Sequence, residues 1–250
     1  MEIFKDRAFP ELRERLNALG IKAVIFDLDD TLIYTSEIFA KYMNEYVEKV
    51  AAETGIEGKI INECLRRNND EEYKTMGVNP TRWAVVVEKM AKEFVGNEDS
   101  IINNLTILMN IYTEKPRIRP GARAALEGLR KIGIKIGMVT HANVDWTWRK
   151  LENVGIIDYF DSILIADENT HKGVEHWQAE MASLEVSPEE CLIVGDNLGG
   201  DIIPTSQIGA RTMWLHKGST WSIYRTGEVP ENTVMIDEVG ELLSALDQLR

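Results

Sequence analysis

Several short apolar runs of the sequence are each followed by a side chain that could take part in chemistry. In chain order these side chains are Asp27 with Asp29, Thr140, Lys172, and Asp196 with Asp201. If the runs are parallel strands, these side chains meet at one edge of a sheet, where open α/β sheets bind their ligands. Residues two apart in an extended segment share a face, so Asp27 and Asp29 are expected to point the same way.

Such a cluster would suit the transfer of a phosphoryl group. Grouped carboxylates repel one another unless a cation holds them, and a few hard oxygen ligands suit Mg²⁺. The ammonium of Lys172 and the hydroxyl of Thr140 would hold an anionic group on the other side. One carboxylate can act as nucleophile, and a second one two residues later can serve as general acid and then as base. The pattern therefore indicates catalysis by positioning and charge neutralisation.

The elements that must position these residues alternate between strand and helix. The runs read as buried strands because they are short, continuous and apolar. Predicted strands span residues 22–26, 134–139, 162–166, 191–194, 211–215 and 233–236. Helices are predicted before Gly20 and over residues 121–132, 143–154, 173–184, 200–208 and 238–249. This alternation predicts an α/β fold with a doubly wound, Rossmann-like parallel sheet.

Residues 36–115 differ from the rest of the chain because they contain no strand candidate. Apolar residues recur at helical spacing after Ser36. The pattern then predicts a short helix over 60–67, a polar loop over 68–79, a helix over 81–95, and a helix over 98–113 capped by Asn97. We therefore expect an all-helical cap domain, residues 35–117, inserted into a core domain formed by residues 1–34 and 118–250.

The chemical residues also form a recognisable set of ordered motifs. They are Asp27-Leu28-Asp29-Asp30-Thr31-Leu32, Thr140, Lys172, and Gly195-Asp196-Asn197 with Asp201. This set resembles the four motifs of the haloacid dehalogenase-like (HAD) hydrolase superfamily, and the resemblance runs from about Lys22 to Leu215. The helical insert is similar to that superfamily's C1-type cap, as in its phosphoglycolate phosphatase and β-phosphoglucomutase relatives.

The resemblance implies a nucleophile, an acid/base and a metal site. It implies that Asp27 is the nucleophile and a magnesium ligand, and that Asp29 is the general acid/base and gives its backbone carbonyl to the metal. Asp196 would bind Mg²⁺ directly, and Asp201 would support the metal site, through water or Lys172.

The resemblance likewise implies a binding site for the substrate's phosphoryl group. Thr140 would donate a hydrogen bond to this group, and Lys172 would neutralise its charge and that of Asp27. Backbone N–H groups near Leu28 and His141 would complete the cradle. His141 stands where Asn or Gly is frequent, and its ring either touches substrate or caps the following helix.

Other residues in and around these motifs are expected to have structural roles. Asp30 is expected to hydrogen-bond within its own loop, and Gly195 to let the chain turn sharply toward the metal. The tryptophans Trp83, Trp146 and Trp148 fall at helical positions and are expected in the core. The cap residues that could contact a leaving group are Arg66, Arg67, Tyr73, Lys74 and Arg82.

Composition limits the partners. The chain has 250 residues, with 28 Lys and Arg against 41 Asp and Glu, for a net charge of −13. We therefore expect no binding of nucleic acid or of an anionic membrane through bulk charge. No apolar stretch approaches the length of a membrane span, and the first twenty residues hold no secretory apolar run, so a cytoplasmic protein is expected. Oligomeric state is left open.

These observations predict a Mg²⁺-dependent phosphatase that hydrolyses a small phosphorylated metabolite through an aspartyl-phosphate on Asp27. Two alternatives use the same fold. A phosphotransferase or phosphomutase would keep every residue named above and differ only in the acceptor. A metal-independent hydrolytic dehalogenase would use the same nucleophile, but its relatives generally lack the second aspartate of the first motif, so Asp29 disfavours it.

Overall fold

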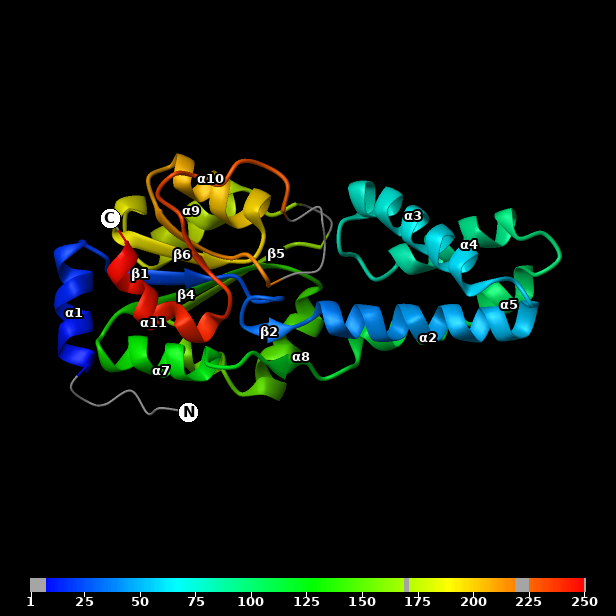
Figure 1. The fold of residues 1–250 in the computed structure, drawn as a ribbon, viewed down its shortest axis with the longest axis horizontal. Helices are drawn as coiled ribbons and strands as arrows, with labels where there is room; N and C mark the ends of the chain where they lie inside the picture. Colours follow the sequence, from blue (N-terminus) through cyan, green and yellow to red (C-terminus); the bar gives the residue numbers. More distant parts are fainter. Residues whose placement is uncertain (1–7, 169–170, 219–224, 250) are drawn as a thin grey trace.

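A parallel β-sheet forms the centre of the larger part of the protein (Figure 1). The structure is a computed structural model that describes residues 8–168, 171–218 and 225–249. The six strands lie in the order β5-β4-β1-β6-β7-β8, and every neighbouring pair is parallel. The strands are β1 (Ala23–Phe26), β4 (Lys135–His141), β5 (Ser162–Ala166), β6 (Cys191–Gly195), β7 (Arg211–Leu215) and β8 (Val234–Ile236). The predicted α/β fold is thereby confirmed.

Helices cover both faces of this sheet, which explains why its strands are continuously apolar. One face packs against α1 (Ala8–Ala18), α7 (Ala122–Lys131), α8 (Val144–Val154) and α11 (Leu242–Ala245). The other face packs against α9 (Val174–Ser183), with α10 (Ile203–Gln207) beside it (Figure 1). Within β1, Val24 and Phe26 face the first layer, and Ala23 and Ile25 face the second.

The register of the central strands determines where the chemical residues lie. β1 lies between β4 and β6, and Phe26 is paired with Met138 on one side and Val194 on the other. The N–H of Asp27 continues the ladder by donating to the Val194 carbonyl at 2.9 Å. Each strand therefore ends at the same edge of the sheet.

A bundle of helices with its own apolar core extends from this edge (Figure 1). It comprises α2 (Ser36–Thr54), α3 (Gly58–Met76), α4 (Arg82–Glu93), α5 (Glu98–Asn103), α6 (Leu105–Met109) and a 3₁₀ turn at Asn110–Tyr112. A small antiparallel ribbon, β2 (Ile33–Tyr34) with β3 (Arg117–Ile118), carries the chain in both directions between the two parts. We propose this ribbon as the boundary between a core domain, 1–34 with 118–250, and a cap domain, 35–117.

Helix α3 corrects the prediction of a short helix followed by a polar loop at 68–79. It continues to Met76, and polar residues of this segment pack in the bundle or face solvent instead of forming a loop. Asn68 is buried, and its amide donates to the Cys64 carbonyl and to Glu93 on α4, both at 3.0 Å.

Two other predicted helices are broken into shorter pieces. The expected helix at 98–113 is interrupted at Asn104, whose amide donates to the Ser100 carbonyl at 2.7 Å, and the side chain of Asn97 makes no capping hydrogen bond. The expected helix at 238–249 is a short α-helix, α11, between two 3₁₀ turns. The ribbon of β2 and β3 was not predicted, because two-residue strands carry no periodic pattern.

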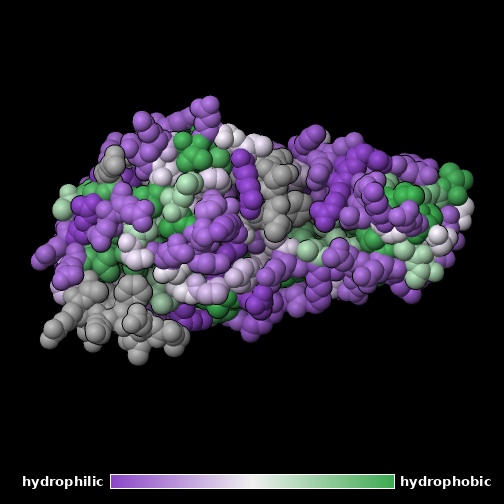
Figure 2. All heavy atoms as spheres, in the orientation of Figure 1, coloured by the Kyte–Doolittle hydropathy of each residue, from purple (hydrophilic) through white to green (hydrophobic). Residues whose placement is uncertain are grey.

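The face of the molecule in Figure 2 is largely hydrophilic. Apolar patches appear on both the cap and the core in this view. Val95, after α4 in the helical bundle, is 80% exposed, and Met235 of β8 is 55% exposed. Among the described residues, no helix combines the length and the apolar character that crossing a bilayer requires.

Candidate active site

Three predicted carboxylates meet at the carboxyl edge of the sheet. Asp27 follows β1, Asp196 follows β6, and Asp201 lies in the next turn; all three are buried, and their oxygens lie within 4.8 Å of one another. The ammonium of Lys172 lies between two of them, with its Nζ 2.5 Å from Asp27 Oδ1 and 2.7 Å from Asp201 Oδ1. The structure therefore brings together four side chains that lie far apart in the sequence.

An unusual turn brings Asp201 into this cluster. A helix was predicted from Gly200, but residues Leu198–Ile202 instead form a π-helical turn, a feature often found at functional sites. Asn197 begins it by accepting a hydrogen bond from the Gly200 N–H at 3.0 Å. Gly195 does not adopt the left-handed backbone that a sharp turn would need. Its role is to leave space, because a Cβ there would overlap the Asp201 carboxylate.

Negative charge in the cluster is only partly compensated. Burial raises the pKa of Asp27 to about 7, and the nearby Lys172 opposes this rise. Burial also raises the pKa of Asp196, and the charge of Asp27 adds to that effect. Asp196 Oδ2 is buried and accepts no hydrogen bond from any described residue. An orphaned carboxylate oxygen beside a second carboxylate is the kind of site that a hard divalent cation such as Mg²⁺ fits.

The uncompensated charge predicts a pH effect in metal-free buffer. Asp27 titrates near 3.8 when unfolded and at about 7 when folded, so the folded chain binds the extra proton between these values. Asp27 should therefore lower the free energy of unfolding as the pH rises from about 4 to about 7. The raised pKa of Lys172 acts only at pH values above its ordinary 10.5. Urea unfolding with EDTA, for the wild type and Asp27→Asn, measures the effect as their difference. A difference that does not change with pH would contradict the prediction.

A small cavity of about 100 Å³ opens beside the cluster. Its lining includes Asp27, Asp29, Thr140, Lys172 and Asp196. Thr140 Oγ1 is buried and has no hydrogen-bond partner among the described residues, so its hydroxyl is available to an anion in the cavity. The Leu28 side chain is buried in the core, so only its backbone can take part.

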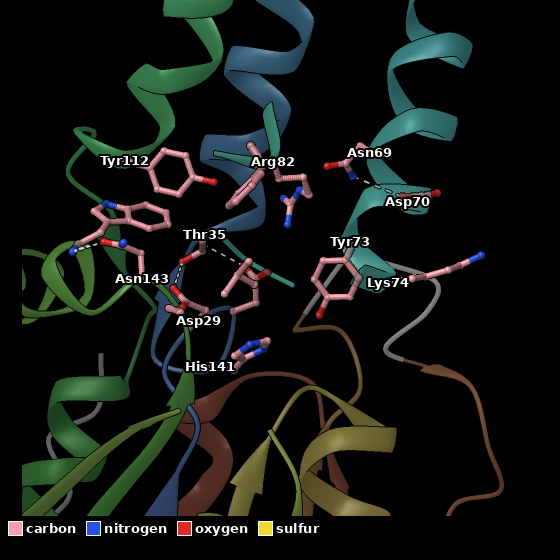
Figure 3. A pocket seen from close by; sticks show the side chains of 15 residues that line it. Asp29, Thr35, Asn69, Asp70, Tyr73, Lys74, Arg82, Tyr112, His141 and Asn143 are labelled. Carbon is pink, nitrogen blue, oxygen red and sulfur yellow. Dashed lines mark hydrogen bonds between the residues drawn. The ribbon is translucent and has the colours of Figure 1, made fainter. Parts of the chain in front are cut away.

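A larger pocket of about 320 Å³ adjoins this cavity, between the core and the cap (Figure 3). Its cap walls include Phe39, Asn69, Tyr73, Arg82 and Tyr112, and its core walls include Asp29, His141, Asn143 and Trp146. Asp29, Tyr73 and His141 line both spaces. The carboxylate of Asp29 therefore lies at the border between a small charged cavity and a larger pocket rich in aromatic rings.

The ring of His141 lines both spaces. The alternative that His141 caps α8 is wrong. Asn143 caps that helix instead, with its side-chain oxygen accepting from the Trp146 N–H at 2.9 Å. The His141 ring packs edge-on to His171 at 5.9 Å, and His171 packs in the same way on Tyr73 of the cap at 6.0 Å. The cap thus reaches the site through a row of rings.

Asp29 is held by two residues that the sequence analysis did not identify. Lys150 of α8 donates to both of its carboxylate oxygens, at 2.5 Å and 2.7 Å, and Thr35 donates to Oδ1 at 2.5 Å. The carboxylate of Asp29 is not among the three that cluster as possible metal ligands. The role of its backbone carbonyl toward a metal stays a prediction.

Asp30 has the structural role that was predicted. It adopts a left-handed backbone, with φ of 61°, and is buried. Its carboxylate accepts from the N–H groups of Thr35 and Ser36, both at 2.9 Å, and from the Ser36 hydroxyl. These bonds fix the loop and the beginning of α2, the first helix of the cap.

Only some of the cap residues predicted to contact a leaving group line the pocket, and only some of the tryptophans expected in the core are buried. Tyr73, Lys74 and Arg82 line the larger pocket, whereas Arg67 pairs with Glu93 and Arg66 with Asn62. Trp83 and Trp146 are buried as expected, but Trp148 is 39% exposed, which corrects its assignment to the core.

A family model described as haloacid dehalogenase-like hydrolase matches residues 21–209. The chain belongs to this family and is a hydrolase. It is 28% identical to a glyceraldehyde 3-phosphate phosphatase of Pyrococcus furiosus, over 79% of this chain and 82% of that one. A protein of the same name from Methanopyrus kandleri is 28% identical, over 92% and 98% of the two chains. The fold is shared with a haloacid dehalogenase-like hydrolase from Xanthomonas campestris (TM-score 0.72, 16% identity, 91% of each chain).

Proposed function

We propose that this chain is a Mg²⁺-dependent phosphatase that hydrolyses a small phosphorylated metabolite through an aspartyl-phosphate on Asp27. The observation that carries the proposal is the place of Asp29 relative to Asp27. Asp27 lies in the charged cavity, and Asp29 lies where that cavity meets the larger pocket. A phosphoryl group in the first space and a leaving group in the second would put Asp29 beside the bond that breaks.

Chemistry in two steps follows from this placement. A carboxylate oxygen of Asp27 attacks phosphorus, and Asp29 gives a proton to the departing oxygen. Water then attacks phosphorus and gives a proton to Asp29, the bond between phosphorus and the Asp27 oxygen breaks, and inorganic phosphate is released, which restores both carboxyl groups. Lys172 and the Thr140 hydroxyl hold the phosphoryl oxygens through both steps.

The metal would be held by Asp27 and Asp196, with Asp201 supporting them through Lys172. When bound, Mg²⁺ would supply positive charge that neutralises the phosphoryl oxygens and the carboxylates around them. The orphaned Asp196 oxygen supports this assignment.

The larger pocket is the proposed site of the leaving group. Phosphatases of small phosphorylated compounds among the relatives support a metabolite of this class. The buried guanidinium of Arg82, which lies over the Tyr73 ring at 5.5 Å, supplies a cation in the cap wall. A polar or anionic group of the metabolite would meet it there.

Phosphate release from a panel of phosphorylated metabolites tests the function. With Mg²⁺, we expect release from glyceraldehyde 3-phosphate, phosphoglycolate or a related compound. EDTA should lower the rate by at least about 10²-fold, since the charge on the phosphoryl oxygens is then not neutralised, and added Mg²⁺ should restore it. Release of halide from a 2-haloacid without metal would support the dehalogenase instead. Transfer of phosphate to a sugar in preference to water would support the phosphotransferase.

A further inference from the structure

A second buried lysine lies next to the charged cluster, and the mechanism above does not use it. The Lys150 side chain is 0% exposed, and Nζ contacts both oxygens of Asp29, whose side chain is 23% exposed. A buried ammonium is costly unless it is paired, so this pair is the main reason that Lys150 can be buried. Lys172 already serves Asp27 and Asp201, and the two lysines therefore bind different carboxylates.

The helix that carries Lys150 also joins the core to the cap. Trp146, one turn earlier on α8, belongs to the apolar cluster of the cap, whereas Leu151 of the same helix belongs to the core cluster. Its ring lies 5.1 Å from Tyr112 in a T-shaped contact and 6.3 Å from Phe39. The Lys150 ammonium lies 4.2 Å from the centre of the same Trp146 ring. A single ring therefore touches both the cap and the cation that binds Asp29.

We propose that Lys150 is a positioning residue for Asp29 and that Trp146 couples this position to the docked cap. The inference rests on the proposed function, in which Asp29 is the acid/base. Thr35, just before the first cap helix, binds the same carboxylate at 2.5 Å. Asp29 is thus held by Lys150 of α8, whose neighbour Trp146 packs in the apolar cluster of the cap, and by Thr35 just before α2.

The geometry indicates what positioning achieves. When Asp29 carries the proton, Oδ1 can still accept from both Lys150 and Thr35, which leaves Oδ2 to bear the proton toward the leaving group. The proton passes from Asp29 to the departing oxygen as the phosphorus–oxygen bond breaks. Lys150 keeps its own protons throughout. An acid held in the productive orientation accelerates only reactions whose leaving group needs a proton.

Lys150→Met tests the proposal with two substrates. An alkyl phosphate has a leaving group that needs a proton, whereas p-nitrophenyl phosphate has one that leaves readily without it. We expect kcat to fall by about 10²-fold or more with the alkyl phosphate and by less than about tenfold with p-nitrophenyl phosphate. Arg149→Met, an exposed cation on the same helix, is the matched control and should change neither rate.

Three further variants keep the test informative. If Lys150→Met does not fold, Lys150→Arg keeps the charge with a different geometry and should show a smaller loss, again confined to the alkyl phosphate. Trp146→Leu should lower kcat with the alkyl phosphate, while Trp148→Leu, at a 39% exposed position of the same helix, should not.

The outcomes separate this inference from the proposed function. Equal losses on both substrates would show a purely structural lysine and overturn the inference while leaving the phosphatase intact. A further loss from Lys150→Met in an Asp29→Asn background would also overturn it, because Lys150 would then act on something other than Asp29. A wild-type chain that releases no phosphate from any substrate would overturn both.

Discussion

Replacing Asp27 with asparagine is expected to reduce phosphate release by at least about 10³-fold and to leave the fold intact. The amide cannot form an aspartyl-phosphate, and no other carboxylate follows β1 in the same position. The fold should survive because Lys172 keeps Asp201 as a partner at 2.7 Å. The measurement is kcat with the best substrate, together with mass spectrometry of acid-quenched enzyme, which should find phosphate on the wild type only.

Asp158→Asn is the matched control, because it makes the same change at an exposed position of the core. It should keep wild-type kcat and thermal stability. An Asp27→Asn enzyme with near wild-type kcat would remove Asp27 from the mechanism, and the other residues of the site would then need a different nucleophile.

Replacing Lys172 with methionine is expected to lower both activity and stability. Lys172 is the cation between Asp27 and Asp201, and its own side chain is only 6% exposed. Removing one partner of a buried ion pair leaves uncompensated charge and typically costs about 3–5 kcal/mol of unfolding free energy. Turnover should fall as well, since the phosphoryl oxygens lose a cation. Urea unfolding in metal-free buffer and phosphate release measure the two effects.

Lys92→Met, at the exposed end of α4, makes the same substitution without removing a buried pair. Its free energy of unfolding should stay within about 0.5 kcal/mol of the wild type. A Lys172→Met enzyme as stable as this control would mean that the carboxylates do not depend on the lysine for compensation.

The parts of the fold and site that the sequence predicted have a common physical origin. The strands were predictable because a short apolar run covered on both faces leaves a continuous pattern, as in residues 191–194. The residues that follow such strands, including Asp27 and Thr140, could then be expected at one edge without knowledge of the distances. Lys172 and Asp201 were found in the same way, a few residues after the runs at 162–166 and 191–194.

The residues that were missed depend on contacts that no local pattern reports. Lys150 lies on the buried face of α8, one turn from Trp146. Its position next to Leu151 in a predicted helix was the only signal in the sequence that this lysine could be buried. A lysine at such a position is usually taken as a long side chain reaching solvent. Asn68 was assigned to a loop because its partner Glu93 is 25 residues away in the chain.

The order of the strands has a consequence for how the protein is made. The proposed nucleophile, Asp27, follows β1, but both neighbours of β1, β4 and β6, come only after the helical insert. On the ribosome, the helices of residues 36–112 emerge and can pack locally while β1 still waits for its partners. The proposed activity therefore requires the late segment around Asp196 and Asp201, and a chain that stops before this segment is expected to be inactive.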